Sequence, residues 1–202
     1  MSAGTIRKVV AGAFALAAML ANGGCVVPVV GLAGTTVVKA SEDRGVGGAI
    51  SDLKIQLQIN DLWLKRDLDM FSRINLSIDQ GRVLLTGQAA TAEQRMEAVR
   101  LCWEADGVTE VLNEIKLDND ATGDSAHDRW ITAKLRTALV LDKDVHNTNY
   151  SIDVVNDVVY LLGVAHSQDE LDRVIAHAKA IAHVQGVVSH VRVVEKDKKD
   201  EK

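Results

Sequence analysis

The strongest constraint on the fold of this chain is an internal repeat, because the same order of sequence signals occurs twice, about 76 to 80 residues apart. Each copy contains two runs in which apolar and polar residues alternate, joined by a turn-forming pair, Gln80-Gly81 in the first copy and Asn156-Asp157 in the second. Such alternation is typical of half-buried strands, and a two-residue connection is typical of a hairpin. The sequence therefore predicts one β-hairpin per copy, built from residues 74–78 with 83–87 and residues 150–154 with 159–163.

A helix-start signature follows each hairpin. Thr91 lies three residues before Gln94, and Ser167 lies three residues before Glu170. This is the spacing of a capping box, in which the hydroxyl of the first residue accepts a hydrogen bond from the backbone N–H of the fourth. Apolar residues then recur at helical spacing, so a helix is expected in both copies. Each copy closes with a glycine and a valine-rich strand, whose alternation is displaced by one residue between the copies, at residues 107–117 and 186–194.

An amphipathic segment also precedes each hairpin. In the second copy, residues 126–141 predict a helix, because their apolar residues share one helical face. These residues are Ile131, Leu135, Ala138 and Leu139. In the first copy the pattern is ambiguous, since residues 53–59 alternate as a strand would.

The repeat favours a helix in the first copy as well. One apolar face of that helix then consists of Ile50, Leu53, Leu57 and Leu64, and a second consists of Ile55, Ile59 and Leu62. A helix with two apolar faces is expected to be covered on two sides, by the other domain or by a partner.

The predicted order is helix, strand, strand, helix, strand, and it occurs twice. It predicts the α+β class, with two tandem domains that each pack two helices on a three-stranded mixed sheet. Domains of about 70 residues lie near the lower size limit for an independent core, so docking of the two would stabilise both. The expected boundaries are residues 46–118 and 126–195 for the domains, 119–125 for a linker and 196–202 for a charged tail.

The N-terminal residues follow the order of a secretory signal. Arg7 and Lys8 precede an apolar run at residues 9–20, and small residues then lead to Cys25. The apolar run is shorter than the roughly 20 residues that span a bilayer. We therefore expect residues 1–24 to be a signal peptide that is removed from the mature protein.

Cys25 resembles the lipid acceptor of a bacterial lipobox, with Asn22 at the position where that motif usually has leucine. Acylation there would anchor the chain, because each buried methylene contributes roughly 0.8 kcal/mol. The next residue is Val26 and not the aspartate that typically retains bacterial lipoproteins in the inner membrane, so we expect the outer membrane. Residues 25–45 suit a tether. The other cysteine, Cys102, is expected to be a buried core residue.

The composition argues against nucleic acid as a partner. Aromatic residues make up 3% of the chain and its formal net charge is −5, so it offers neither an aromatic stacking platform nor an overall basic surface. Attraction to an anionic surface must come from a local basic patch. The sequence contains no glycine-rich phosphate loop, nucleophile elbow or paired-carboxylate arrangement. We expect a non-enzymatic protein with no cofactor and no small-molecule substrate.

The histidines invite a metal-site interpretation, but no two of them have the four-residue spacing of a helical zinc site, and no second cysteine stands nearby. The sequence therefore predicts no metal site. The six histidines are His127, His146, His166, His177, His183 and His190.

Four motifs, together with their order and duplication, give the chain a family resemblance. They are residues 43–47 leading to Asp52, residues 73–88, residues 107–115 and residues 130–136. With Cys25 in front of them, they resemble the dual BON-domain lipoproteins of the DolP type over nearly the whole chain. The resemblance implies a periplasm-facing, non-enzymatic lipoprotein of the outer membrane, whose BON domains recognise anionic phospholipid and support envelope integrity. It also implies that the lipid-contacting surface lies on the first helix of the second domain, where the matching positions begin at Trp130.

Trp130 is the main candidate for a membrane contact. It precedes Ile131, so it points about 100° away from the stripe that faces the core. Lys134, Thr137 and Leu141 flank it on one side, whereas Arg129 and Arg136 project on another. A tryptophan beside basic residues suits a membrane interface, although the same ring could pack against the first domain.

Two hypotheses follow for the function. The leading one is a lipid-anchored module that binds anionic phospholipid membrane through Trp130, Lys134, Leu141 and Arg129. The alternative is a periplasmic protein-interaction or stress-protective, chaperone-like module, which would bind an envelope protein partner through the apolar surface of Ile55, Ile59 and Leu62.

Overall fold

The computed structural model describes residues 45–118 and 125–194. The predicted signal peptide, Cys25, nearly all of the predicted tether, the charged tail and most of the predicted linker lie outside these residues. Within the two described ranges, no helix combines the length and hydropathy needed to cross a membrane.

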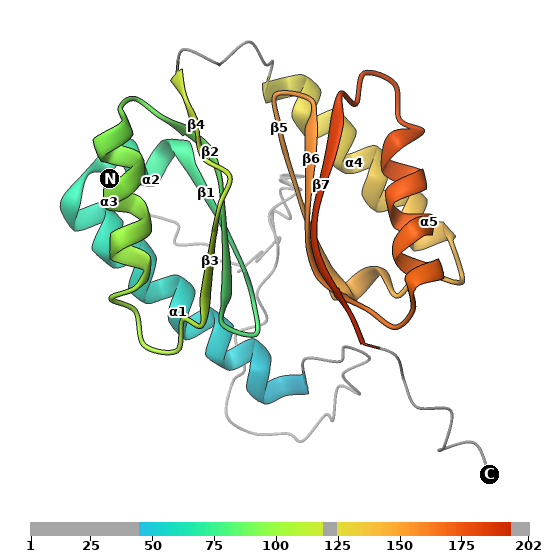
Figure 1. The fold of residues 1–202 in the computed structure, drawn as a ribbon, viewed down its shortest axis with the longest axis horizontal. Coiled ribbons are helices and arrows are strands. Elements are labelled where there is room, and N and C mark those ends of the chain that lie inside the picture. The colour runs from blue at the N-terminus through green and yellow to red at the C-terminus, as the bar shows by residue number, and fades with distance from the viewer. Residues whose placement is uncertain (1–44, 119–124, 195–202) are drawn as a thin grey trace, which may run out of the picture. The chain divides into compact units, whose positions relative to one another are not determined.

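The first domain places helices on one face of a mixed sheet (Figure 1). Strands β1 and β2 are antiparallel, and β3 and β4 both run parallel to β2. The elements are α1 (Gly45–Arg66), α2 (Leu68–Arg73), β1 (Ile74–Asp79), β2 (Arg82–Ala89), α3 (Ala92–Cys102), β3 (Glu110–Asn113) and β4 (Lys116–Leu117).

The second domain repeats this plan, with α4 and α5 on one face of a sheet of order β5-β6-β7 (Figure 1). Strand β5 is antiparallel to β6, and β7 is parallel to β6. The predicted α+β fold with two tandem helix-and-sheet domains is confirmed. The elements are α4 (Ser125–Leu141), the 3-10 helix η2 (Asn147–Asn149), β5 (Tyr150–Val155), β6 (Val158–Ala165), α5 (Gln168–Lys179) and β7 (Gly186–Val193).

Both predicted hairpins form, and the first helix of each domain holds its hairpin turn. The Gln80-Gly81 and Asn156-Asp157 pairs have positive φ at both positions, as tight two-residue hairpin turns require. The carboxylate of Asp52 on α1 accepts the two backbone N–H groups of the first turn, both at 2.9 Å. Asp128 on α4 does the same for the second turn, at 3.0 and 2.9 Å. In each domain, one carboxylate therefore joins the first helix to the turn of the hairpin.

Both capping boxes also form. The Thr91 and Ser167 hydroxyls accept hydrogen bonds from the backbone N–H groups of Gln94 and Glu170, each at 3.1 Å. Helices α3 and α5 begin directly after these caps.

The predicted displacement of the last strand between the copies is wrong. Val83 pairs with Val111 in the first domain, and the equivalent Val159 pairs with Val187 in the second. The first domain differs because its last strand is interrupted between β3 and β4, where the backbone N–H of Glu114 still bonds to the Leu85 carbonyl at 2.8 Å. Pairing then resumes in the same register in β4. The two copies therefore differ in that the last strand of the first domain is interrupted, while its register with the neighbouring strand is the same in both.

The predicted faces of α1 are corrected by the structure. Ile55 and Ile59 are buried in the core of their own domain, together with Trp63, which the sequence analysis did not place there. Leu53, Leu57 and Leu64, on the other predicted apolar face, were expected to be covered but are 50%, 61% and 52% exposed. The helix therefore turns Ile55 and Ile59 inward, and the alternative hypothesis loses the surface on which it was placed.

Cys102 is a buried core residue, as predicted. Its thiol is fully enclosed in the core of the first domain, and this burial raises the pKa of Cys102 to about 12. A thiol with so high a pKa stays protonated and unreactive at neutral pH.

A third group of buried apolar residues includes both sheets. Leu84 on β2 belongs to it together with Tyr160 and Leu162 on β6, and all three are at most 2% exposed. Polar contacts accompany them, since the Arg82 guanidinium donates to the His190 carbonyl at 2.9 Å. These residues occupy strand positions that point away from the helices of their own domain.

Candidate membrane-binding face

The candidate face lies on helix α4, which is amphipathic over its whole length. Ile131, Leu135 and Leu139 recur every four residues and are at most 1% exposed, so they bind α4 to the core of the second domain. The opposite side carries the exposed side chains. Among them are Arg129, Trp130, Lys134, Arg136, Val140 and Leu141, which we call the α4 face.

Trp130 is held on this face by neighbours from its own domain. Its side chain is 42% exposed, and the Lys134 ammonium lies 5.8 Å from the centre of its ring, within cation–π range. The His127 ring also stacks on Trp130, with 5.8 Å between the ring centres. The His127 ring is itself fixed by Asp157, whose carboxylate lies 2.8 Å from its Nδ1. The indole is therefore oriented while a large part of it stays accessible to a partner.

The α4 face is basic as well as apolar. Arg129, Lys134 and Arg136 are all exposed, and none of them forms an ion pair with a carboxylate of the described residues. At the far end of the helix, Val140 and Leu141 are 64% and 75% exposed. Cations beside exposed apolar side chains are the combination that an anionic membrane surface attracts.

The nearest acidic residue after this face is neutralised within the domain. Asp142 lies 2.7 Å from His177 Nε2 and 3.6 Å from the Arg173 guanidinium. The hydrogen bond from His177 lowers the pKa of Asp142, so that its charge is present but paired. The cations of the α4 face are therefore left without a competing free carboxylate at the helix end.

All four residues that the sequence analysis selected for lipid contact are exposed on α4: Arg129, Trp130, Lys134 and Leu141. Sequence reasoning missed Val140, although it lies eleven residues after Arg129 and so shares its side of the helix. It also missed His127, although His127 lies three residues before Trp130 on the same helix and so is its neighbour on the helix surface.

The chain matches the BON domain over residues 51–119 and again over residues 127–195. It belongs to the BON-domain family. The resemblance inferred from the sequence motifs is thereby confirmed, and the two matches coincide with the two helix-and-sheet units of the structure.

The sequence of this BON protein is similar to those of three bacterial proteins over most of its length. It is 38% identical over 146 residues to an uncharacterised protein in the gshII 5′ region of Anaplasma centrale, covering 71% of this chain and 95% of that protein. It is 30% identical over 159 residues to the 21 kDa hemolysin of Actinobacillus pleuropneumoniae, covering 76% and 78%. It is 28% identical over 175 residues to the outer membrane lipoprotein DolP of Haemophilus influenzae, covering 85% and 86%. The similarity to DolP therefore extends across both domains.

Proposed function

We propose that this BON protein is a lipid-anchored, non-enzymatic protein of the bacterial envelope that binds anionic phospholipid through the α4 face and supports envelope integrity. The observation that carries the proposal is the exposed indole of Trp130, in contact with both Lys134 and the stacked His127 ring. An indole prefers the headgroup region of a bilayer, and each nearby cation adds about 1 kcal/mol on an anionic surface. The similarity to an outer membrane lipoprotein supports the same location for this chain.

Vesicle flotation tests the lipid contact. Trp130→Glu removes the indole and places a negative charge among the headgroups, so binding to vesicles with anionic phospholipid should fall about tenfold or more. Binding to purely zwitterionic vesicles should be weak for both proteins, because the cations of the α4 face then lack a partner.

Trp103→Glu is the matched control, because Trp103 is also an exposed tryptophan, 54% accessible, but lies after α3 in the first domain. Its replacement should leave flotation unchanged. Equal flotation of Trp130→Glu and the unaltered protein, with circular dichroism spectra that match, would remove Trp130 from the binding surface.

The anchor is proposed to be Cys25, with the outer membrane as its site and the periplasm as the compartment of the two domains. The charged and apolar segments before Cys25 support this, as does the name of the DolP relative. The mass of the mature N-terminus decides it. A chain that begins at Cys25 and carries acyl groups is the expected result, and a mature chain that starts elsewhere without acyl mass contradicts it.

Protein interaction is the second candidate function, now on a different surface. Leu53, Leu57 and Leu64 form an exposed apolar stripe along α1. Contiguous exposed apolar side chains are typical of a surface that binds another protein. Crosslinking in cells would favour this function if it recovered one stoichiometric envelope protein and if the purified chain failed to float with anionic vesicles.

A further inference from the structure

We propose that His146, His166 and Glu170 form a binding site for a divalent transition-metal ion, with Zn²⁺ as the best match. The three side chains come from separate places: the segment before η2, the connection between β6 and α5, and the first turn of α5. Each offers one ligand atom, and these atoms all lie within 4.8 Å of one another. The site is independent of the α4 face, and so it goes beyond the function proposed above.

Two imidazoles and one carboxylate are a donor set suited to Zn²⁺, which binds nitrogen and oxygen ligands at about 2.0–2.2 Å. The Nδ1 atom of His146 lies 3.3 Å from Glu170 Oε1, and the Nδ1 atom of His166 lies 4.0 Å from Glu170 Oε2. The rings are in edge-to-face contact, with centres 4.2 Å apart. Small inward rotations of the two rings would therefore bring three ligand atoms around one ion.

Glu170 is prepared as an anionic ligand. Its side chain is only 4% exposed, and burial by itself would raise the pKa of the carboxyl, yet hydrogen bonds from the backbone N–H groups of His146 and His166 hold that pKa below its ordinary value. Both hydrogen bonds are 2.8 Å long, one to each carboxylate oxygen. A carboxylate oxygen has two lone pairs, so an oxygen that accepts one backbone N–H can also bind an ion without the carboxylate moving.

A hydrogen-bond partner is also present for Nε2 of His166, the ring nitrogen that would not bind the metal. The amide nitrogen Nδ2 of Asn149, on a side chain only 2% exposed, lies 3.4 Å from Nε2 of His166. When Nδ1 of a histidine binds a metal, its other ring nitrogen carries a proton that a carbonyl oxygen typically accepts. A flip of the Asn149 side-chain amide, which exchanges its nitrogen and its oxygen, would place Oδ1 beside Nε2 to accept that proton. His146 is exposed, so an ion can enter from solvent and a water molecule can complete its coordination.

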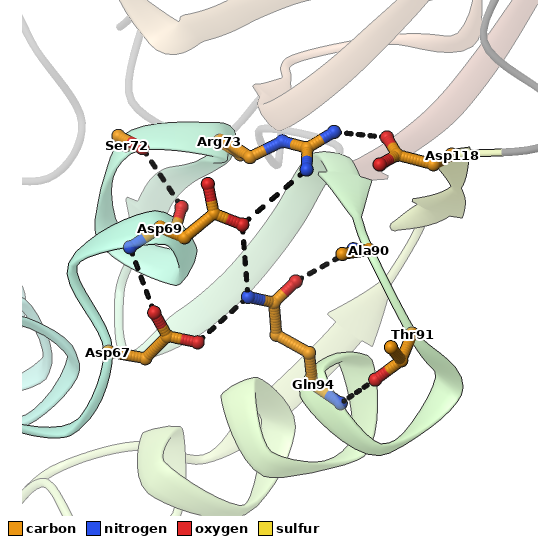
Figure 2. Close-up of polar contacts among 8 residues, drawn as sticks. All are labelled: Asp67, Asp69, Ser72, Arg73, Ala90, Thr91, Gln94 and Asp118. Carbon is orange, nitrogen blue, oxygen red and sulfur yellow. Dashed lines mark hydrogen bonds and ion pairs between the residues drawn. The ribbon is translucent and has the colours of Figure 1, made fainter.

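The first domain shows that the fold does not require these ligands. Gln94 follows the cap of α3 as Glu170 follows the cap of α5, and Ala90 stands where His166 stands. Figure 2 shows the Gln94 amide accepting the Ala90 N–H at 2.7 Å and donating to Asp67 at 2.9 Å. The equivalent loops are thus joined by an amide without any histidine. Met70, buried in the core, takes the place of His146 four residues before the first strand.

Calorimetric titration of the purified full chain with ZnCl₂, without a polyhistidine tag and after removal of metals by a chelator, tests the site. One ion should bind per chain. His146→Ala should weaken binding about tenfold or more, because one of three protein ligands is lost. His146 is exposed, so this variant should keep its fold. Glu170→Gln and His166→Ala, which copy the first domain, should weaken binding as well, with folding checked by circular dichroism.

His177→Asn is the matched control, since His177 also faces a carboxylate, that of Asp142, in the same domain. Its affinity for Zn²⁺ should be unchanged. X-ray absorption of the loaded protein should report two imidazole ligands with Zn–N distances of about 2.0 Å. Failure of Zn²⁺ to bind, or binding that survives the double change His146→Ala and His166→Ala, would overturn the proposal.

Discussion

Gly87 and Gly163 occupy the same position in the two domains, at the point where the second strand of the hairpin passes the start of the first. A Cβ atom on Gly163 would lie 2.0 Å from the Asn149 carbonyl oxygen, and one on Gly87 would lie 2.3 Å from that of Arg73. Both glycines have positive φ, +144° and +93°, which residues with side chains rarely adopt. Two independent reasons, space and backbone conformation, therefore require glycine here.

Gly163→Ala should lower the free energy of unfolding by about 1–3 kcal/mol or more, because the strained φ and the clash act together. Gly186→Ala is the control, since its Cβ would meet nothing closer than Val158 Cγ1 at 3.7 Å. Urea denaturation of both variants measures the difference. Equal stabilities of the two would show that the strand moves aside without cost.

Short-range patterns in the sequence were enough to predict the turn pairs and the caps, because each depends on residues within four positions of one another. The Asp52 and Asp128 carboxylates that bind the hairpin turns were not predicted, since their partners lie 28 and 29 residues away. The proposed zinc ligands were missed in part for this reason, since His146 lies 24 residues from Glu170. The four-residue spacing of His166 and Glu170 was present, but it joins a histidine to a carboxylate and not to a second histidine.

At the scale of elements, α1 shows why an apolar pattern alone does not identify the buried face of a helix. Its apolar residues fit two helical faces, and the alternative hypothesis placed Ile55, Ile59 and Leu62 on the face that a partner would cover. The structure buries Ile55, Ile59 and Trp63, whose indole N–H donates to the Ala98 carbonyl at 3.3 Å. A buried tryptophan needs such a partner, and only the packed α3 supplies it. Helix α2 was missed because six residues are too few to show a period.

The start of α5 is the element whose stability should depend on pH. The pKa of Glu170 is lower in the folded protein than its ordinary value of 4.5. The ionised carboxylate therefore stabilises the fold fully at a pH above 4.5. This stabilisation is lost as the pH falls through the lower pKa of the folded state. In buffer with a chelator, Glu170→Gln should cost about 1–3 kcal/mol at pH 7, because one charged acceptor is lost. The difference from the unaltered protein should shrink as the pH falls below about 4.5.

Asp169→Asn is the control for Glu170→Gln. It separates the effect of the Glu170 hydrogen bonds from the effect of a negative charge at the N-terminus of the helix. Asp169 also lies in the first turn of α5, but it is exposed. Thermal unfolding between pH 3 and pH 7 should give Asp169→Asn a small effect, from the helix dipole alone. A pH dependence as large as that of Glu170→Gln would mean that the dipole, and not the two backbone hydrogen bonds, controls the stability of this end.

At the scale of the whole molecule, the shared apolar group makes the two small domains depend on each other. Leu84 is 1% exposed, and its companions in that group, Tyr160 and Leu162, belong to the other domain. Domains of this size bury a small core, so the apolar area that the shared group removes from water adds to the stability of both. Removal of a buried apolar side chain from the sheet of the first domain should therefore also destabilise the second domain.

Leu84→Ala should cost about 2–4 kcal/mol and should lower the hydrogen-exchange protection of β6, in the domain that was not changed. Leu85→Ala is the matched comparison, because the neighbouring Leu85 is also fully buried but lies in the core of the first domain alone. Its effect should be largest in β2 and α3. Unchanged protection of β6 in Leu84→Ala, with a normal loss in β2, would show that each domain is stable by itself and that the shared apolar group contributes little to the second.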